Sequence, residues 1–140
     1  MKKIIFFLLT LIALSGTACS NEHTPISVDQ LPQTAQQFIK TYFSDCTISL
    51  IEKDGHEYDV HFANGYEIDF DKNGEWESID CQINPIPNGI VPAAINNYIQ
   101  NNYPQTFIVE ISRDRHGYDV ELNNHMELEF NQNGEFLRID

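Results

Sequence analysis

The chain contains one sequence unit twice. Residues 31–80 align with residues 91–140 at a constant offset of 60 and without a gap. Seventeen of the fifty aligned positions are identical, among them an Asp-x-His-x-Tyr-Asp-Val run that starts at Asp54 and again at Asp114. A gapless match of this length indicates a duplicated supersecondary unit that packs against its copy. We therefore predict one compact domain of two repeats, joined by a linker at residues 81–90.

Each repeat opens with an amphipathic helical pattern. Pro32 and Pro92 precede these patterns and are predicted to lie in the first helical turn, where a proline loses no hydrogen bond. Residues on the apolar side recur at helical spacing: Ala35, Phe38, Ile39 and Tyr42 in the first copy, and Ile95, Tyr98, Ile99 and Asn102 in the second.

Four strand patterns follow each helix. In the first repeat they occupy residues 46–53, 58–62, 66–70 and 75–80, and the second repeat matches them 60 residues later. The middle two patterns alternate apolar and polar residues strictly, which is typical of a sheet with one covered face. Asp-Gly and Asn-Gly pairs between the patterns predict hairpin turns. The expected fold is α+β: a tandem repeat of a helix plus four antiparallel strands, forming one curved antiparallel sheet with the helices on one face.

The first 18 residues have the layout of a secretory signal peptide. Two lysines precede an apolar run over residues 4–14 that is too short to span a bilayer comfortably, and small residues then lead to Cys19. Cys19 is either the lipidated N-terminus of a lipoprotein, or it follows an ordinary signal peptidase site. Both interpretations place the mature chain outside the cytoplasm. We expect a cell-envelope lipoprotein, held to the outer membrane or a periplasm-facing membrane by its N-terminal lipid, with residues 19–30 as a tether.

The charge of the chain is strongly acidic. Its 21 Asp and Glu residues face 8 Lys and Arg residues, which gives a formal net charge of −13. Nucleic acid and anionic membrane surfaces repel such a chain. A partner that recognises the charge is therefore cationic: a basic protein patch, a peptide or a metal ion. The alternative is that the acidic residues only keep an exported protein soluble.

The alternation of the strands places most acidic side chains on one face. If the apolar residues face the helices, the polar residues between them form an acidic surface that no helix covers. This surface is the predicted partner-binding site, and the alternative is a solvated sheet face. Ile79, Leu137 and Ile139 are predicted on the same side. The predicted binding residues are Glu57, Asp59, His61, Glu67, Asp69, Glu75, Glu77, Asp119, Glu121, Glu127, Glu129 and Glu135.

Two cysteines remain after Cys19, namely Cys46 and Cys81. An even pair in an oxidising compartment permits a disulfide. A simple four-strand meander, however, would hold the two cysteines too far apart to bond. The disulfide is therefore an open prediction.

These motifs resemble a known family. The chain has a Leu-Pro helix start at Leu31, an aromatic-rich helix end, Tyr-x-Val, and an Asp/Asn-x-Asn-Gly-Glu hairpin at Asp71 and again at Asn131, behind a lipoprotein-type signal. The pattern is similar to the PepSY-like envelope proteins, whose fold is similar to that of the beta-lactamase inhibitor protein. The resemblance covers residues 31–140. It implies a binding or inhibitory role without catalytic residues or a cofactor.

Metal and enzyme chemistry find little support in the residues. The segment from Asp69 to Asp80 has the spacing of a calcium loop, but it lies between strand patterns and ends in Asp instead of Glu. We favour the alternative, a hairpin turn in which Asn73 and Gly74 supply the required backbone angles, and predict no metal site. His56 and His116 fall in matching turns, where exposed histidines are expected. No nucleophile elbow or phosphate loop occurs in the sequence.

The sequence thus favours an exported, non-enzymatic module that binds a basic partner through its acidic sheet face. The alternative is a structural or assembly component of a cell-envelope complex. A hydrolase of unrecognised type is the third and least favoured interpretation.

Overall fold

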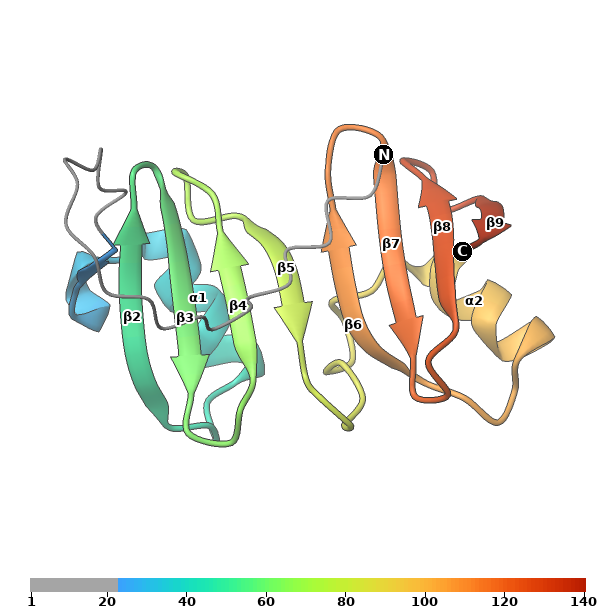
Figure 1. Cartoon of the computed structure of the whole chain (residues 1–140), viewed down its shortest axis with the longest axis horizontal. Helices are drawn as coiled ribbons and strands as arrows, with labels where there is room; N and C mark the ends of the chain where they lie inside the picture. Colours follow the sequence, from blue (N-terminus) through green and yellow to red (C-terminus); the bar gives the residue numbers. More distant parts are fainter. Residues whose placement is uncertain (1–22) are drawn as a thin grey trace, which may run out of the picture.

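The computed structural model describes residues 23–140, which form one open antiparallel sheet of nine strands and two helices. The strands lie in chain order from β1 to β9, so each strand pairs with its sequence neighbours (Figure 1). Both helices lie behind the sheet in this view, which leaves the front face without a helical cover. The elements are β1 (Thr24–Pro25), a 3₁₀ turn (Val28–Gln30), α1 (Gln33–Tyr42), β2 (Ile48–Asp54), β3 (Glu57–Phe62), β4 (Glu67–Phe70), β5 (Trp76–Asp80), α2 (Ala93–Asn102), β6 (Ile108–Arg113), β7 (Gly117–Leu122), β8 (Glu127–Asn131) and β9 (Phe136–Ile139).

The predicted fold is confirmed: each repeat is one helix followed by four antiparallel strands, and both helices cover the same face. The helices begin one residue later than predicted. Pro32 and Pro92 are the N-cap residues, with extended ψ angles of 143° and 140°, instead of residues of the first turn. The N-cap position suits proline equally well, because it also requires no backbone donor.

The core lies between each helix and its own four strands. Ala35 and Ile39 are the buried residues of α1, and Ile95 and Ile99 are their equivalents on α2. Aromatic rings fill the remaining space. Phe43 stacks on Phe62 with ring centres 5.6 Å apart, while Tyr98 meets Phe130 edge-on at 5.5 Å and stacks on Phe136 at 4.6 Å. Burial of these residues stabilises the packing of helix on sheet.

Two hairpin turns hold the helix starts against the sheet. Gly74 and Gly134 have φ angles of 81° and 77°, which residues other than glycine rarely adopt. A Cβ atom at Gly74 would lie 2.8 Å from the backbone nitrogen of Ala35, and one at Gly134 would lie 2.9 Å from the Cβ of Ala94. The Asn-Gly sequence therefore serves two needs, the turn conformation and the close approach of the helix.

The two repeats join through β5 and β6. Ser78, Ile79 and Asp80 pair with Ser112, Ile111 and Glu110, respectively, which makes the sheet continuous across the repeat boundary. Ile79 is completely buried, so its predicted position on the acidic side is wrong. The cause is a bulge. Phe70 pairs with Trp76 and Asp69 with Ser78, which leaves Glu77 as the extra residue and reverses the alternation after it. The equivalent bulge in β9 brings Ile139 opposite the core residue Leu128, so Ile139 also lies on the helix side.

The segments before the helices belong to the folded domain. Thr24 and Pro25 pair with β2, so the middle of the predicted tether is the first strand of the sheet. In the predicted linker, Ile86 and Ile90 are buried in the core. The predicted signal peptide and Cys19 lie outside the described residues. No helix within residues 23–140 is long and apolar enough to cross a membrane.

Candidate functional site

The candidate site is the open face, the face of the sheet that the helices leave uncovered. Strand pairing aligns its side chains in two rows that cross both repeats. In the first, which we call the glutamate row, each acidic residue lies directly opposite the next across a strand boundary. The glutamate row consists of Glu67, Asp80, Glu110, Glu121 and Glu127 on strands β4 to β8.

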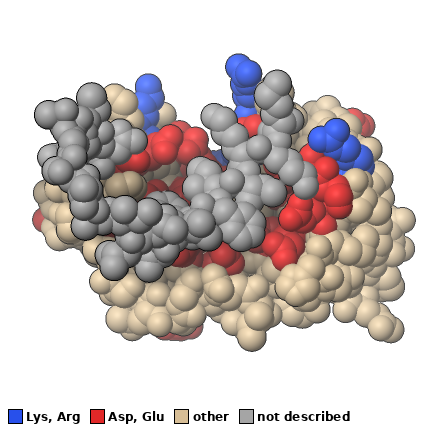
Figure 2. Space-filling model, viewed as in Figure 1, with Lys and Arg blue, Asp and Glu red and all other residues tan. Residues whose placement is uncertain are grey.

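The second row, the aspartate row, runs parallel to the first. It is acidic in each repeat and interrupted by two serines at the repeat boundary. Figure 2 shows Asp and Glu gathered over the middle of this face, with Lys and Arg at its upper rim. The aspartate row consists of Glu52, Asp59, Asp69, Ser78, Ser112, Asp119 and Glu129 on strands β2 to β8.

Burial, together with crowding in the rows, raises the pKa values of the central carboxyls. Directly opposed side chains on neighbouring strands have Cβ atoms about 5 Å apart, so ionised neighbours repel each other. Burial first, and then the charges of Asp59 and Glu67, raise the pKa of Asp69 to about 7. Burial, followed by the charges of Asp80 and Glu121, likewise raises the pKa of Glu110 to about 7. Each repeat thus holds one carboxyl that gains or loses a proton near neutral pH.

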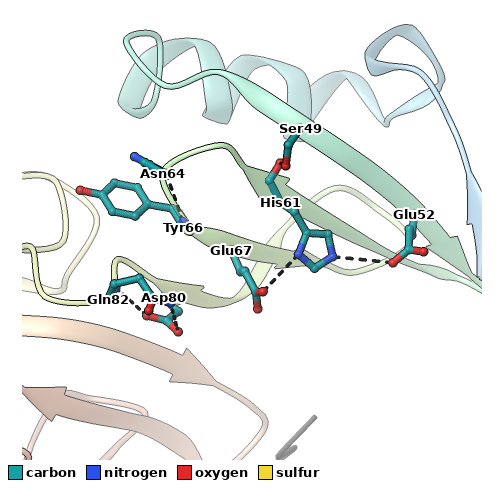
Figure 3. A network of polar contacts seen from close by, with 8 residues as sticks. All are labelled: Ser49, Glu52, His61, Asn64, Tyr66, Glu67, Asp80 and Gln82. Carbon is teal, nitrogen blue, oxygen red and sulfur yellow. Dashed lines mark hydrogen bonds and ion pairs between the residues drawn. The ribbon is translucent and has the colours of Figure 1, made fainter. Parts of the chain in front are cut away.

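His61 is a basic residue on the open face of the first repeat, opposite Glu67. Its Nδ1 lies 3.1 Å from Oε1 of Glu67, and its Nε2 lies 3.7 Å from Oε2 of Glu52 (Figure 3). It thereby joins the two rows at their first-repeat end. In the second repeat the equivalent position is Glu121, which is 3.0 Å from His125 Nδ1. The second repeat therefore has a glutamate where the first has a histidine, and its part of the glutamate row is more acidic.

Longer basic side chains take other positions. Arg113 and Lys53 pair with Tyr118 and Tyr58, residues of the helix side. The Arg113 guanidinium lies 4.1 Å from the centre of the Trp76 ring, and the Lys53 ammonium lies 5.7 Å from the Tyr58 ring. Arg138 ends the aspartate row on β9 and contacts Glu129 at 2.7 Å. On strands β2 to β8, therefore, no lysine or arginine lies in either row.

The structure brings together most, but not all, of the predicted binding residues. Glu57 lies on the open face beyond the rows, opposite Asp54. Glu75 and Glu135 lie beside the hairpin turns, and Glu77 is the bulged residue of β5. The remaining predicted residues lie in the rows or, like His61, contact them. The prediction missed Glu52, Asp80 and Glu110, because bulges shift the alternation of β2, β5 and β6 by one residue.

The calcium-loop spacing belongs to a hairpin turn. Asp71 Oδ1 accepts hydrogen bonds from the backbone nitrogens of Asn73 and Glu75, at 2.8 and 3.0 Å. Asp80 lies in the glutamate row, where it accepts hydrogen bonds from Gln82 (Figure 3). Among residues 23–140, no group of three or more His, Cys, Asp or Glu side chains is arranged to hold a metal ion. His56 and His116 lie in the turns between strands, as predicted.

Both cysteines of the described chain are free thiols. Cys46 is partly exposed and Cys81 is buried, before β2 and after β5 respectively. Strands β3 and β4 lie between β2 and β5 in the sheet. Burial raises the pKa of Cys81 to about 12, so its reactive thiolate is scarce at neutral pH. The disulfide between them stays a prediction.

Known proteins share this architecture. Residues 17–61 and 56–138 match the family described as putative beta-lactamase-inhibitor-like, PepSY-like. A putative calcium-regulated periplasmic protein of Bacteroides thetaiotaomicron has a similar structure, with 42% identity, a TM-score of 0.80, and coverage of 83% of this chain and 94% of the other. A putative periplasmic protein of Bacteroides vulgatus has 39% identity, a TM-score of 0.83, and coverage of 86% and 98%. No curated protein matches the chain.

Proposed function

The chain belongs to the PepSY-like, beta-lactamase-inhibitor-like family, and we propose that it is a non-enzymatic binding or inhibitory module whose open face holds a basic protein or peptide. One observation carries this proposal: two rows of acidic side chains cross both repeats in register, on the face without helices. Within a repeat, neighbouring carboxyls repel each other, and this repulsion costs stability in the absence of a partner. Lysine and arginine side chains of a partner relieve it.

The spacing of the rows favours a partner that lies across the strands. Neighbouring strands are about 4.8 Å apart, so the five carboxyls of the glutamate row span about 19 Å. An extended segment with several basic residues, or a basic loop, is long enough to contact both repeats. Charge attraction of this kind speeds the approach of the partner and weakens as salt is added.

The site of action that we propose is the cell envelope. Both Bacteroides relatives are described as periplasmic, and the signal-like first 18 residues agree with export. We further propose that lipid at Cys19 anchors the chain. Metabolic labelling with a fatty acid tests the anchor: the wild type should be labelled and Cys19→Ala should not, whereas an unlabelled wild type would refute it.

The proposed function is tested by capture from envelope extracts with matched charge variants. The row variant carries Glu67→Lys and Glu127→Lys, equivalent positions of the glutamate row. The control carries Asp29→Lys and Asp45→Lys, which change the net charge equally at exposed sites away from the open face. Circular dichroism checks that all three proteins are folded.

We expect the wild type and the control to retain the same partner at moderate salt, and the row variant to lose it. Equal capture by the row variant would refute binding through the rows. A partner that stays bound to all three proteins at high salt, within a large complex, would favour the alternative role of an envelope assembly component.

Calcium is a second candidate ligand, because the Bacteroides thetaiotaomicron relative is described as calcium-regulated. Calcium prefers carboxylate oxygens, and the rows supply them in opposed pairs. Since no three-residue metal cluster is preformed in residues 23–140, we propose that calcium competes with the basic partner instead of occupying a closed site. Capture repeated with millimolar calcium and with a chelator tests this, and equal capture in both would exclude the competition.

A further inference from the structure

The two repeats expose equivalent strands to different surroundings. β5 and β9 are related by the offset of 60, and both carry an isoleucine at the same position, Ile79 and Ile139. Ile79 is completely buried, because β6 pairs along the outer edge of β5. Ile139 is 51% exposed, since no strand among residues 23–140 lies outside β9. A surface that is an internal interface in the first repeat is therefore open in the second.

The outer edge of β9 is competent to pair. The backbone nitrogen of Asp140 donates to the carbonyl of Glu127 on β8. Because backbone groups alternate in direction along a strand, the N–H and C=O of Ile139 point away from β8. Leu137 and Ile139 add exposed apolar surface to this edge. Natural edge strands are normally protected by proline, charge or short length.

The opposite edge of the sheet has this protection. β1 has only two residues, and one of them is Pro25, which has no N–H to donate. β1 also covers the edge of β2, the strand equivalent to β6. Another copy therefore cannot dock at this end as β6 docks on β5, and the two ends of the sheet are not complementary. A partner for β9 has to present an edge other than β2.

We propose that β9 pairs with β9 of a second copy, in an antiparallel dimer with two-fold symmetry. The register follows the internal junction, where Ser78, Ile79 and Asp80 lie opposite residues 112, 111 and 110. By analogy with Ile79 opposite Ile111, we place Ile139 opposite Ile139 of the second copy, on the helix side. This register also places Arg138 opposite Asp140, twice, on the open face.

Charge complementarity distinguishes this register from its neighbours. If the two-fold axis passed through Arg138 instead of Ile139, the two Arg138 side chains would lie directly opposite each other. Like charges in directly opposite positions destabilise a sheet. Each arginine already contacts Glu129 at 2.7 Å and Asp140 of its own chain at 3.8 Å, and in the proposed register it also lies opposite Asp140 of the other copy. The glutamate and aspartate rows then continue from one copy to the next. Because only a short strand pairs, we expect weak association at a specific site.

Site-specific cross-linking tests the register in the full chain. In the proposed dimer, residue 139 faces itself across an antiparallel pair, within the Cα separation that a disulfide bridges. Residue 137 is on the same strand and is equally exposed, at 56%, but it does not face itself. We compare Ile139→Cys with Leu137→Cys under mild oxidation, and use the wild type to measure the background from its natural cysteines.

We expect Ile139→Cys to form a covalent dimer about tenfold faster than Leu137→Cys, because only its thiols are held in bonding range. Equal rates, or rates at the wild-type background, would overturn the proposal. Sedimentation velocity gives a second measurement. The wild type should shift toward a dimer as its concentration rises, and Ile139→Lys should remain monomeric. A wild type that stays monomeric at millimolar concentration would also overturn it.

Discussion

The carboxyl of Asp69 provides a direct test of crowding on the open face. Burial and the neighbouring acids raise its pKa from 3.8 to about 7 in the folded chain. One pKa unit corresponds to about 1.4 kcal/mol, so the whole change corresponds to at most about 4 kcal/mol. Contact of this carboxyl with water reduces this free energy, and we expect a contribution to stability of about 2 kcal/mol. Asp69→Asn removes the titrating group while keeping its size and its ability to hydrogen bond.

The sign of the effect follows from proton binding. The folded chain holds the Asp69 proton more tightly than the unfolded chain does, because folding raises the pKa. The stabilisation from this proton is complete below pH 3.8 and is lost as the pH rises through about 7. The amide that replaces the carboxyl in Asp69→Asn cannot lose a proton. The variant should therefore gain stability relative to the wild type, by about 1–2 kcal/mol, between pH 5 and pH 8.

Urea unfolding at several pH values measures this difference, and Asp45→Asn is the control. Asp45 is exposed and lies in the loop before β2, away from both rows. Its substitution measures the effect of removing one exposed carboxyl outside the rows. If the curves of Asp69→Asn and the wild type run parallel from pH 5 to pH 8, the raised pKa that burial and the neighbouring acids give to Asp69 is refuted.

Two further predictions compare pairs of residues. Ile79→Ala should lower the unfolding free energy by about 3–4 kcal/mol in urea, because Ile79 is fully buried at the repeat junction. Ile139→Ala should lower it by less than about 1 kcal/mol, and equal losses would contradict the assigned burial. Gly74→Ala should lower the stability by about 3 kcal/mol in thermal unfolding, since the added Cβ would meet Ala35. Gly55 has a φ of 60° but open space around it, so Gly55→Ala should lower the stability by only about 1 kcal/mol. Similar losses in the two variants would show that close packing at Gly74 is unimportant.

Local patterns were sufficient to predict the architecture. The offset of 60 identified the repeats, and helical and alternating periodicity located both helices and the eight strands of the repeats. Asn-Gly pairs marked the hairpins because few other residues adopt the required backbone angles. β1 was missed, since two residues carry no periodicity. Its pairing with β2 depends on contacts that are distant in the sequence.

The acidic face was predicted in outline, but its rows were not. Alternation places Asp59 and Glu127 correctly, because β3 and β8 are regular where these residues lie. It fails at Ile79 and Glu110, because a bulge adds one residue and reverses the two faces of the strand beyond it. A bulge depends on how two strands match in length and twist. The sequence of one strand does not contain that information.

The central claim is that basic groups bind at the rows, and a nuclear magnetic resonance titration tests it most directly. The probe is a short lysine-rich peptide added to isotope-labelled protein, with a glutamate-rich peptide of equal length as the control. We expect chemical-shift changes at backbone amides of β3 to β8, concentrated at the glutamate and aspartate rows, which disappear in the Glu67→Lys, Glu127→Lys variant and persist in the Asp29→Lys, Asp45→Lys variant. Changes confined to α1 and α2, or changes of equal size in both variants, would contradict the account.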